Sequence, residues 1–180
     1  MLLNRRLFLG AVSGVFAASS CDRVFAAVPP GGARSVALHN LHTGESLSVD
    51  YWIDGAYQAD AMAEVDRVLR DFRTGDVHPM AATLLDLLTG LRRKLDTDRP
   101  FEVISGYRSP RTNAILREAH EHSGVAAKSL HMQGMAIDIR VPGRALASLR
   151  DAALAVRGGG VGYYPASDFV HVNVGRVRRW

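Results

Sequence analysis

Residues 129–138 read SLHMQGMAID, and the rest of the chain is best interpreted outward from this stretch. Gly134 permits a tight turn, and the residues after it alternate in the manner of a β-strand. Asp138 lies in that strand between Ile137 and Ile139, so the strand's period of two turns its carboxylate to the face opposite both isoleucines. A carboxylate flanked in this way is not expected to be an ordinary solvated residue, which makes Asp138 a candidate functional group.

A second strand, expected over residues 169–174, presents a polar group in the same manner. His171 lies between two valines and therefore faces away from both. A catalytic zinc site uses three protein ligands and leaves one position open for water. Imidazole nitrogen and carboxylate oxygen suit such a site, and His131, Asp138 and His171 supply them. The same set of two histidines and one carboxylate also suits ferrous iron, so the sequence leaves the native ion open.

The remaining pattern predicts an α+β fold with a central antiparallel sheet, flanking helices and the zinc site on the sheet. Residues 35–40 and 46–52 are expected to form a hairpin around a turn at residues 42–45. Apolar residues at helical spacing predict two scaffold helices, over residues 57–72 and 80–95. The second half is expected to hold strands over 101–104, 135–141, 161–164 and 169–174, and helices over 111–122 and 145–156.

The composition is that of a folded protein of one domain. The chain has 180 residues, of which 47% are hydrophobic and 22% charged, a balance typical of globular proteins. No uninterrupted apolar run reaches 18 residues, which excludes a multi-span membrane protein and predicts no membrane span in the mature chain. The formal net charge of +4 falls to +2 when residues 1–26, with three arginines and one aspartate, are set aside. We therefore expect no nucleic acid as a partner.

Residues 1–26 are typical of an export signal. Paired arginines at positions 5 and 6 precede an apolar stretch rich in small residues, so the twin-arginine export machinery is an expected partner. Export predicts a periplasmic location, with residues 27–34 as a flexible start and residues 35–180 as a single domain. Cys21 is the only cysteine, so no disulfide can form within the chain. Its surroundings loosely resemble a lipoprotein attachment box, but we expect Cys21 to leave with the signal.

The motifs of the second half resemble a known family. Residues 129–138 fit the pattern Ser-x-His-x-x-Gly-x-Ala-x-Asp, and an acidic residue stands three positions before His171, which is similar to the zinc D-Ala-D-Ala peptidases of the M15 type. Within that superfamily, the mature chain resembles the DUF882, or YcbK-like, murein endopeptidase subgroup over nearly its whole length. Its motifs are LHTGE at 41–45, SGYRS at 105–109, SLH at 129–131, GMAID at 134–138, GYYP at 162–165 and FVHV at 169–172. The resemblance implies a hedgehog/DD-peptidase-like fold.

The resemblance also implies roles for individual residues. The metal ligands would be His131, Asp138 and His171. Asp168, three residues before the last ligand, stands where such peptidases carry the general base, although many relatives have Glu there. Arg108 matches an arginine that opposes negative charge developing on the scissile carbonyl oxygen. Ser129 and Gln133 are weaker candidates, for substrate hydrogen bonds or for orienting the ligands.

The implied function is hydrolysis of peptide cross-links in peptidoglycan by a water that zinc activates. The sequence does not choose between endopeptidase and carboxypeptidase action, or between 4–3 and 3–3 cross-links. We favour an endopeptidase, because the subgroup resembled consists of cross-link hydrolases. The alternative is a zinc-containing domain of the same fold that binds cell-wall peptide or a protein without hydrolysing it, and such a domain has no need of Asp168. The basic residues 176–179 are interpreted as a solvated tail rather than a patch for wall polymer.

Overall fold

The structure, a computed structural model, describes residues 32–119 and 125–180. The expected export signal at residues 1–26, with Cys21, lies outside these residues, as does most of the expected flexible start. Among the described residues, no helix combines the length and the apolar character needed to cross a membrane.

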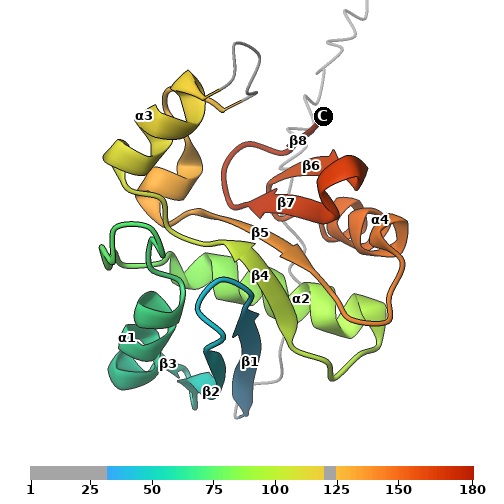
Figure 1. Cartoon of the computed structure of the whole chain (residues 1–180). Coiled ribbons are helices and arrows are strands. Elements are labelled where there is room, and N and C mark those ends of the chain that lie inside the picture. The colour runs from blue at the N-terminus through green and yellow to red at the C-terminus, as the bar shows by residue number, and fades with distance from the viewer. Residues whose placement is uncertain (1–31, 120–124) are drawn as a thin grey trace, which may run out of the picture.

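The core of the molecule is one eight-stranded sheet with the order β3-β2-β1-β4-β5-β7-β6-β8 (Figure 1). The strands are β1 (Ala33–Asn40), β2 (Ser46–Ile53), β3 (Ala56–Tyr57), β4 (Phe101–Ser105), β5 (Ala136–Arg140), β6 (Gly160–Tyr164), β7 (Phe169–Asn173) and β8 (Arg178–Arg179). The expected hairpin is confirmed as β1 and β2, and the expected strands of the second half are confirmed as β4, β5, β6 and β7. The short strands β3 and β8, at the two edges of the sheet, were not predicted.

The sheet is mixed, which corrects the expectation of a wholly antiparallel arrangement. The four central strands β4, β5, β7 and β6 do pair antiparallel. However, β1 lies parallel to β4, and β8 lies parallel to β6. The parallel pair β1–β4 arises because a long crossover with two helices joins β3 to β4. This crossover returns the chain so that β4 runs in the same direction as β1, as parallel neighbours require.

Four α-helices and two short 3-10 helices accompany the sheet in the described residues. The helices are α1 (Ala59–Val68), α2 (Ala82–Leu95), α3 (Pro110–Glu118), α4 (Leu146–Val156), η1 (Leu130–Gln133) and η2 (Pro165–Ser167). The four predicted helices are therefore confirmed, with shorter bounds for α1 and α3. Ser109 caps α3, since its side chain accepts a hydrogen bond from the Thr112 amide, and Pro110 occupies the first turn.

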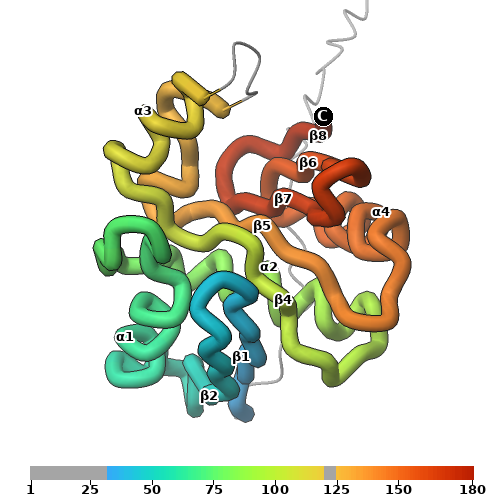
Figure 2. Tube along the Cα trace, viewed as in Figure 1, coloured from blue at the N-terminus to red at the C-terminus, as the bar shows by residue number. Residues whose placement is uncertain are grey.

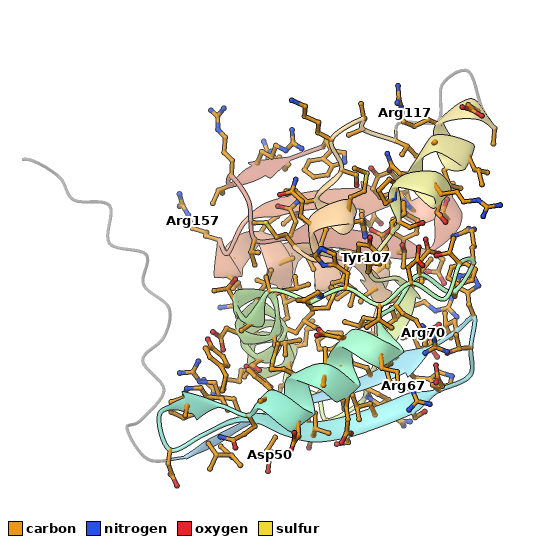
Figure 3. The ribbon with its side chains drawn as sticks, turned by 90° about the vertical axis from the view of Figure 1, so that its left-hand side faces the viewer. Asp50, Arg67, Arg70, Tyr107, Arg117 and Arg157 are labelled. Carbon is orange, nitrogen blue, oxygen red and sulfur yellow. The ribbon has the colours of Figure 1, made fainter. Side chains whose placement is uncertain are left out.

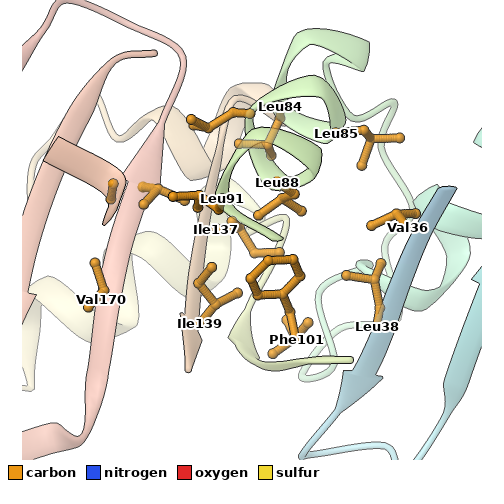
Figure 4. Close-up of a cluster of buried hydrophobic side chains, with 14 of the residues drawn as sticks. Val36, Leu38, Leu84, Leu85, Leu88, Leu91, Phe101, Ile137, Ile139 and Val170 are labelled. Atoms are coloured by element: carbon orange, nitrogen blue, oxygen red, sulfur yellow. The ribbon is translucent and has the colours of Figure 1, made fainter. Parts of the chain in front are cut away.

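The hydrophobic core lies on one face of the sheet, against α2. That helix runs behind β4 in the tube view (Figure 2). Its leucines, among them Leu84, Leu88 and Leu91, face Phe101 and the isoleucines of β5 (Figure 4). Side chains that alternate with these core residues along β5 and β7 must then point to the opposite face. That opposite face is where the polar residues singled out from the sequence gather.

Candidate metal centre

One rung of the sheet brings the predicted ligands together. Asp138 of β5 is paired directly with His171 of β7, and His171 with Gly162 of β6. Their chain neighbours Ile137, Ile139, Val170 and Val172 are fully buried in the core. The alternation read from the sequence is therefore confirmed, and the carboxylate and imidazole share the other face.

His131 completes the cluster from η1, the short helix that precedes β5. Its Nε2 lies 3.1 Å from His171 Nδ1 and 3.3 Å from Asp138 Oδ1, and His171 Nδ1 lies 2.8 Å from the same oxygen. Donor atoms around a tetrahedral zinc ion, each about 2.0–2.1 Å from it, are ~3.4 Å apart. The three residues, which we call the floor of the site, thus fit a small metal ion with little movement.

Two constraints hold His131 in place. Its Nδ1 donates a hydrogen bond to the carbonyl of Gly106 (2.7 Å), which leaves the lone pair of Nε2 directed at the other two residues. After η1 the chain turns at Gly134, whose φ of 64° lies in the left-handed region. A Cβ on Gly134 would lie only 2.1 Å from the carbonyl oxygen of Pro79, so this position requires glycine for space as well as for conformation.

His171 is held through Asn173, two residues along the same strand. The Asn173 Oδ1 accepts hydrogen bonds from the amides of Gly160 (3.1 Å) and Gly175 (3.0 Å), so its amide nitrogen faces the ring. That nitrogen lies 3.0 Å from His171 Nε2, which must accept, leaving the proton of the neutral ring on Nδ1 to be donated to Asp138. If Nδ1 were to hold a metal, the proton of the ring would be on Nε2, where Asn173 offers no acceptor.

The electrostatics of the floor favour an ionised Asp138 carboxylate and a neutral His171 ring. Burial opposes ionisation of the Asp138 carboxyl, but the adjacent His131 and His171 hold its pKa below the usual range. Burial likewise lowers the pKa of His171, although Asp138 works against this shift. An ionised Asp138 carboxylate beside a neutral His171 ring is the state that binds a cation.

Arg108 faces the floor from the loop between β4 and α3. Its guanidinium lies 3.6 Å from Asp138 Oδ2 and is 12% exposed. Burial lowers the pKa of Arg108, and Asp138 opposes this shift. The loop is fixed by backbone hydrogen bonds from Tyr107 to Leu69 and from Arg108 to His131, and Figure 3 shows Tyr107 between α1 and the strands of the site.

A buried aspartate outside the site anchors this loop. Asp71 accepts hydrogen bonds from the amides of Ser109 (2.9 Å) and Arg73 (3.0 Å). Burial opposes its ionisation, but the nearby hydroxyls of Thr112 and Ser109 and the two amides lower the pKa of Asp71 to about 2. The region predicted only as scaffold therefore helps to position Arg108.

A cavity of about 460 Å³ opens above the floor. Its lining includes Arg108 and Ser129, two of the residues singled out from the sequence. Ser129 is buried, and its Oγ accepts a hydrogen bond from the amide of His131 (3.4 Å), so it caps η1. Gln133 is exposed at the end of η1 and does not line the cavity.

Asp168, predicted as the general base, does not line this cavity. It follows η2 at a positive φ of 54°, and its side chain is 62% exposed. Its carboxylate accepts a hydrogen bond from Arg140 (2.7 Å) and does not line the cavity. Arg140 shares the face of β5 that carries Asp138, so its guanidinium draws Asp168 toward the end of the strand.

One side of the cavity was missed by sequence reasoning. Arg178, Arg179 and Trp180 line it, and we call these three residues the wall of the site. The basic end of the chain is exposed, as predicted, but it is not a free tail, because β8 pairs with β6. The sequence did contain one indication of this wall. Glycines at alternate positions of a strand, here Gly160 and Gly162, indicate that another group approaches the strand closely.

Comparisons with known proteins agree with this geometry. A family model described as "Peptidoglycan L,D-endopeptidase MepK" matches residues 29–180. The chain is 41% identical over 179 residues to the protein of Escherichia coli (strain K12) named "Peptidoglycan L,D-endopeptidase MepK", which covers 98% of this chain and 97% of that protein. It is 38% identical over 160 residues to the protein of Haemophilus influenzae named "Probable peptidoglycan L,D-endopeptidase MepK", with 88% and 85% covered.

Proposed function

Because the chain belongs to the family of MepK-type peptidoglycan L,D-endopeptidases, we propose that it hydrolyses peptide cross-links of peptidoglycan with the help of a zinc ion. The observation that carries this proposal is the floor, where two imidazoles and one carboxylate converge within 3.3 Å of one another beneath an open cavity. Three ligands with one side left open are typical of catalytic rather than structural zinc.

His131, Asp138 and His171 would hold the ion. A zinc ion bound there would polarise the scissile carbonyl and lower the pKa of a water beside it. Arg108, fixed by its loop and close to the floor, would stabilise negative charge on the carbonyl oxygen as the tetrahedral state forms. Ser129 would act indirectly, by holding the η1 helix that carries His131, and Gln133 is retained only as a contact for the outer part of the substrate.

We propose Asp168 as the general base because it stands three residues before His171, where related peptidases carry that group. It would take a proton from the attacking water and pass it to the leaving amine. For this role, the Asp168 carboxylate must leave Arg140 and contact the attacking water instead. Asp168 is exposed on the turn before β7, which leaves room for that movement.

The relatives' names indicate which bond to test. An L,D-endopeptidase cuts between an L-centre and a D-centre, which is the linkage of a 3–3 cross-link, whereas a 4–3 cross-link joins two D-centres. We therefore propose 3–3 cross-links as the substrate of this chain.

Digestion of purified muropeptide dimers tests the proposal. Residues 27–180, loaded with zinc, are incubated with 3–3 and with 4–3 dimers, and the products are identified by mass spectrometry with and without a chelator. We expect chelator-sensitive conversion of 3–3 dimers to monomers. Intact 3–3 dimers in a sample with one zinc per chain would overturn the proposal.

A second candidate function is favoured by one observation, that Asp168 is not among the residues that line the cavity. It is a zinc-containing module that binds wall peptide without cutting it. Binding of intact dimers by zinc-loaded protein, with no cleavage of either cross-link, supports this candidate.

We further propose that the protein works in the periplasm, that residues 1–26 direct it there through the twin-arginine machinery, and that the mixed sheet is of the hedgehog/DD-peptidase-like type. Replacing both leader arginines, at positions 5 and 6, by lysine tests the export route. We expect the protein to remain in the cytoplasm, and unchanged export would contradict a twin-arginine signal.

A further inference from the structure

The cavity above the floor carries a marked excess of positive charge. Four cationic side chains line it: Arg108, Lys128, Arg178 and Arg179. The one carboxylate side chain in the lining is Asp138, which both histidines already contact. Within residues 32–119 and 125–180, neither Lys128 nor either wall arginine makes an ion pair. Such a cavity attracts an anionic ligand more than a neutral one.

Trp180 is fixed as a flat surface beside the floor. Its indole lies over β6, where Gly162 leaves the space open: a Cβ on Gly162 would be 2.8 Å from the ring. The indole Nε1 donates a hydrogen bond to the Tyr164 hydroxyl (2.7 Å), and the ring centroid lies 5.4 Å from that of His171. Backbone hydrogen bonds to Val161 and Tyr163 hold the residue from both sides.

This indole remains 47% exposed in spite of those contacts. An aromatic side chain that is ordered by a hydrogen bond and still open on one side is suited to packing against a ligand, because its ordering costs little further entropy on binding. Its position beside His171 places any such ligand next to the metal centre.

Arg178 adds a directional group to this surface. Its guanidinium carbon lies 4.6 Å from the centre of the Trp180 ring. Stacking on an aromatic face orients the planar guanidinium and leaves its N–H groups free, and these match a carboxylate in a two-point contact. Arg179, which also lines the cavity, adds charge without such stacking.

We propose that the wall is the substrate-recognition surface of the cleft: Arg178 binds a carboxylate of the cross-linked stem peptide while Trp180 packs against the residue that carries it. The identity of the ligand as stem peptide rests on the proposed function. The chemistry fits, because stem peptides combine several free carboxylates with small apolar side chains. The wall therefore determines affinity and specificity, whereas the floor carries out the reaction.

Steady-state kinetics of the zinc-loaded protein on muropeptide dimers test the wall. Arg178→Ala and Trp180→Ala are each expected to raise KM about tenfold with kcat and zinc content unchanged, the loss of one charged contact or one packed aromatic ring. Trp180→Phe should retain most of the affinity. Arg176→Ala is the matched control, because Arg176 is exposed in the same segment and does not line the cavity.

A binding measurement separates recognition from hydrolysis. The chain has two tryptophans, so Trp52→Phe leaves Trp180 as the single fluorescent indole. The metal-free Trp52→Phe protein is titrated with the monomeric stem tetrapeptide and with the same peptide amidated at its carboxyl groups. We expect a saturable change in emission with the free acid, about tenfold weaker binding after Arg178→Ala, and little response to the amidated peptide.

The outcomes are distinguishable. If dimers are not cleaved but the free acid binds in an Arg178-dependent manner, the proposed hydrolysis is wrong and the proposal that the wall recognises stem peptide is supported. If dimers are cleaved while Arg178→Ala and Trp180→Ala behave like Arg176→Ala, the wall proposal is overturned. It is also overturned if these substitutions lower kcat or zinc content at unchanged KM, because the wall would then act only by supporting His171.

Discussion

The floor and the wall of the cavity differ in burial, in partners and in how the chain specifies them. The floor side chains His131, Asp138 and His171 are 3%, 7% and 12% exposed, and each contacts the other two. The wall residues Arg178–Trp180 are exposed and line the cavity with charge that no described carboxylate neutralises. A buried set of this kind is preorganised for one small ion, whereas an exposed charged surface recognises a larger ligand.

This difference predicts separable effects. Changes on the floor should alter metal binding and kcat, and changes on the wall should alter KM. The predictions below test whether that division holds, beginning with the largest effect.

Removal of a floor ligand is expected to have the largest effect. His131→Ala deletes one of the three donors, so zinc binding should fail. Because bound metal contributes several kcal/mol to transition-state stabilisation, kcat should fall on the order of 10³-fold or more. Zinc content by mass spectrometry and cleavage of dimers measure both losses. Retained zinc with retained activity would place the metal centre elsewhere.

Asp168→Asn tests whether Asp168, which does not line the cavity, takes part in the reaction at the floor. If Asp168 is the general base, kcat should fall about 10²-fold or more with zinc content unchanged. Arg140→Ala is the companion variant, because it releases the Asp168 carboxylate from its present partner. An unchanged kcat in Asp168→Asn would show that Asp168 is not the general base and serves only as the partner of Arg140 in an ion pair.

Asn173→Asp should increase the affinity of the floor for zinc. A carboxylate can accept the proton of His171 Nε2 with one oxygen while the other accepts from Gly160 and Gly175. Carboxylate partners of metal-binding histidines change metal affinity by about 10–100-fold, and we expect zinc to bind at least ~10-fold more tightly. Competition with a chromophoric chelator measures the change. Weaker binding would show that the Asn173 amide already supports the ligand.

The smallest effect concerns stability rather than chemistry. The pKa of Asp71 is lowered to about 2, so its hydrogen bonds stabilise the folded state above the ordinary carboxyl pKa. That contribution, about 2 kcal/mol, should be lost progressively as the pH falls below 4 toward 2. Asp71→Asn should remove this pH dependence in urea unfolding, whereas Asp76→Asn, an exposed neighbour, should leave it intact. Equal pH dependence in both variants would contradict the account.

The floor could be predicted from the sequence because it depends on local rules. The alternation around Asp138 and His171 fixed which way each side chain points, and two neighbouring strands of opposite direction then bring them to one rung. His131 followed from its short separation from Asp138 across the turn at Gly134. The direction of each side chain required only the local pattern, whereas the pairing of the two strands, which joins residues 33 apart in the chain, was an assumption that the structure confirms.

The wall and the position of Asp168 could not be predicted in the same way. Trp180 reaches the site only because β8 pairs with β6 and Gly162 leaves room for the indole, a contact between segments that the pattern of either segment alone does not reveal. Asp168 is drawn to Arg140, a partner 28 residues away in the chain. The parallel pairing of β1 with β4 also arises from a long crossover rather than from local propensity.

The most direct test of the account is a zinc titration of chelator-treated protein, followed by both bound metal and cleavage of 3–3 dimers. The account predicts that cleavage is absent without metal, rises in proportion to added zinc and reaches its plateau at one ion per chain. Cleavage by the metal-free protein, or one bound ion per chain without cleavage, would contradict it.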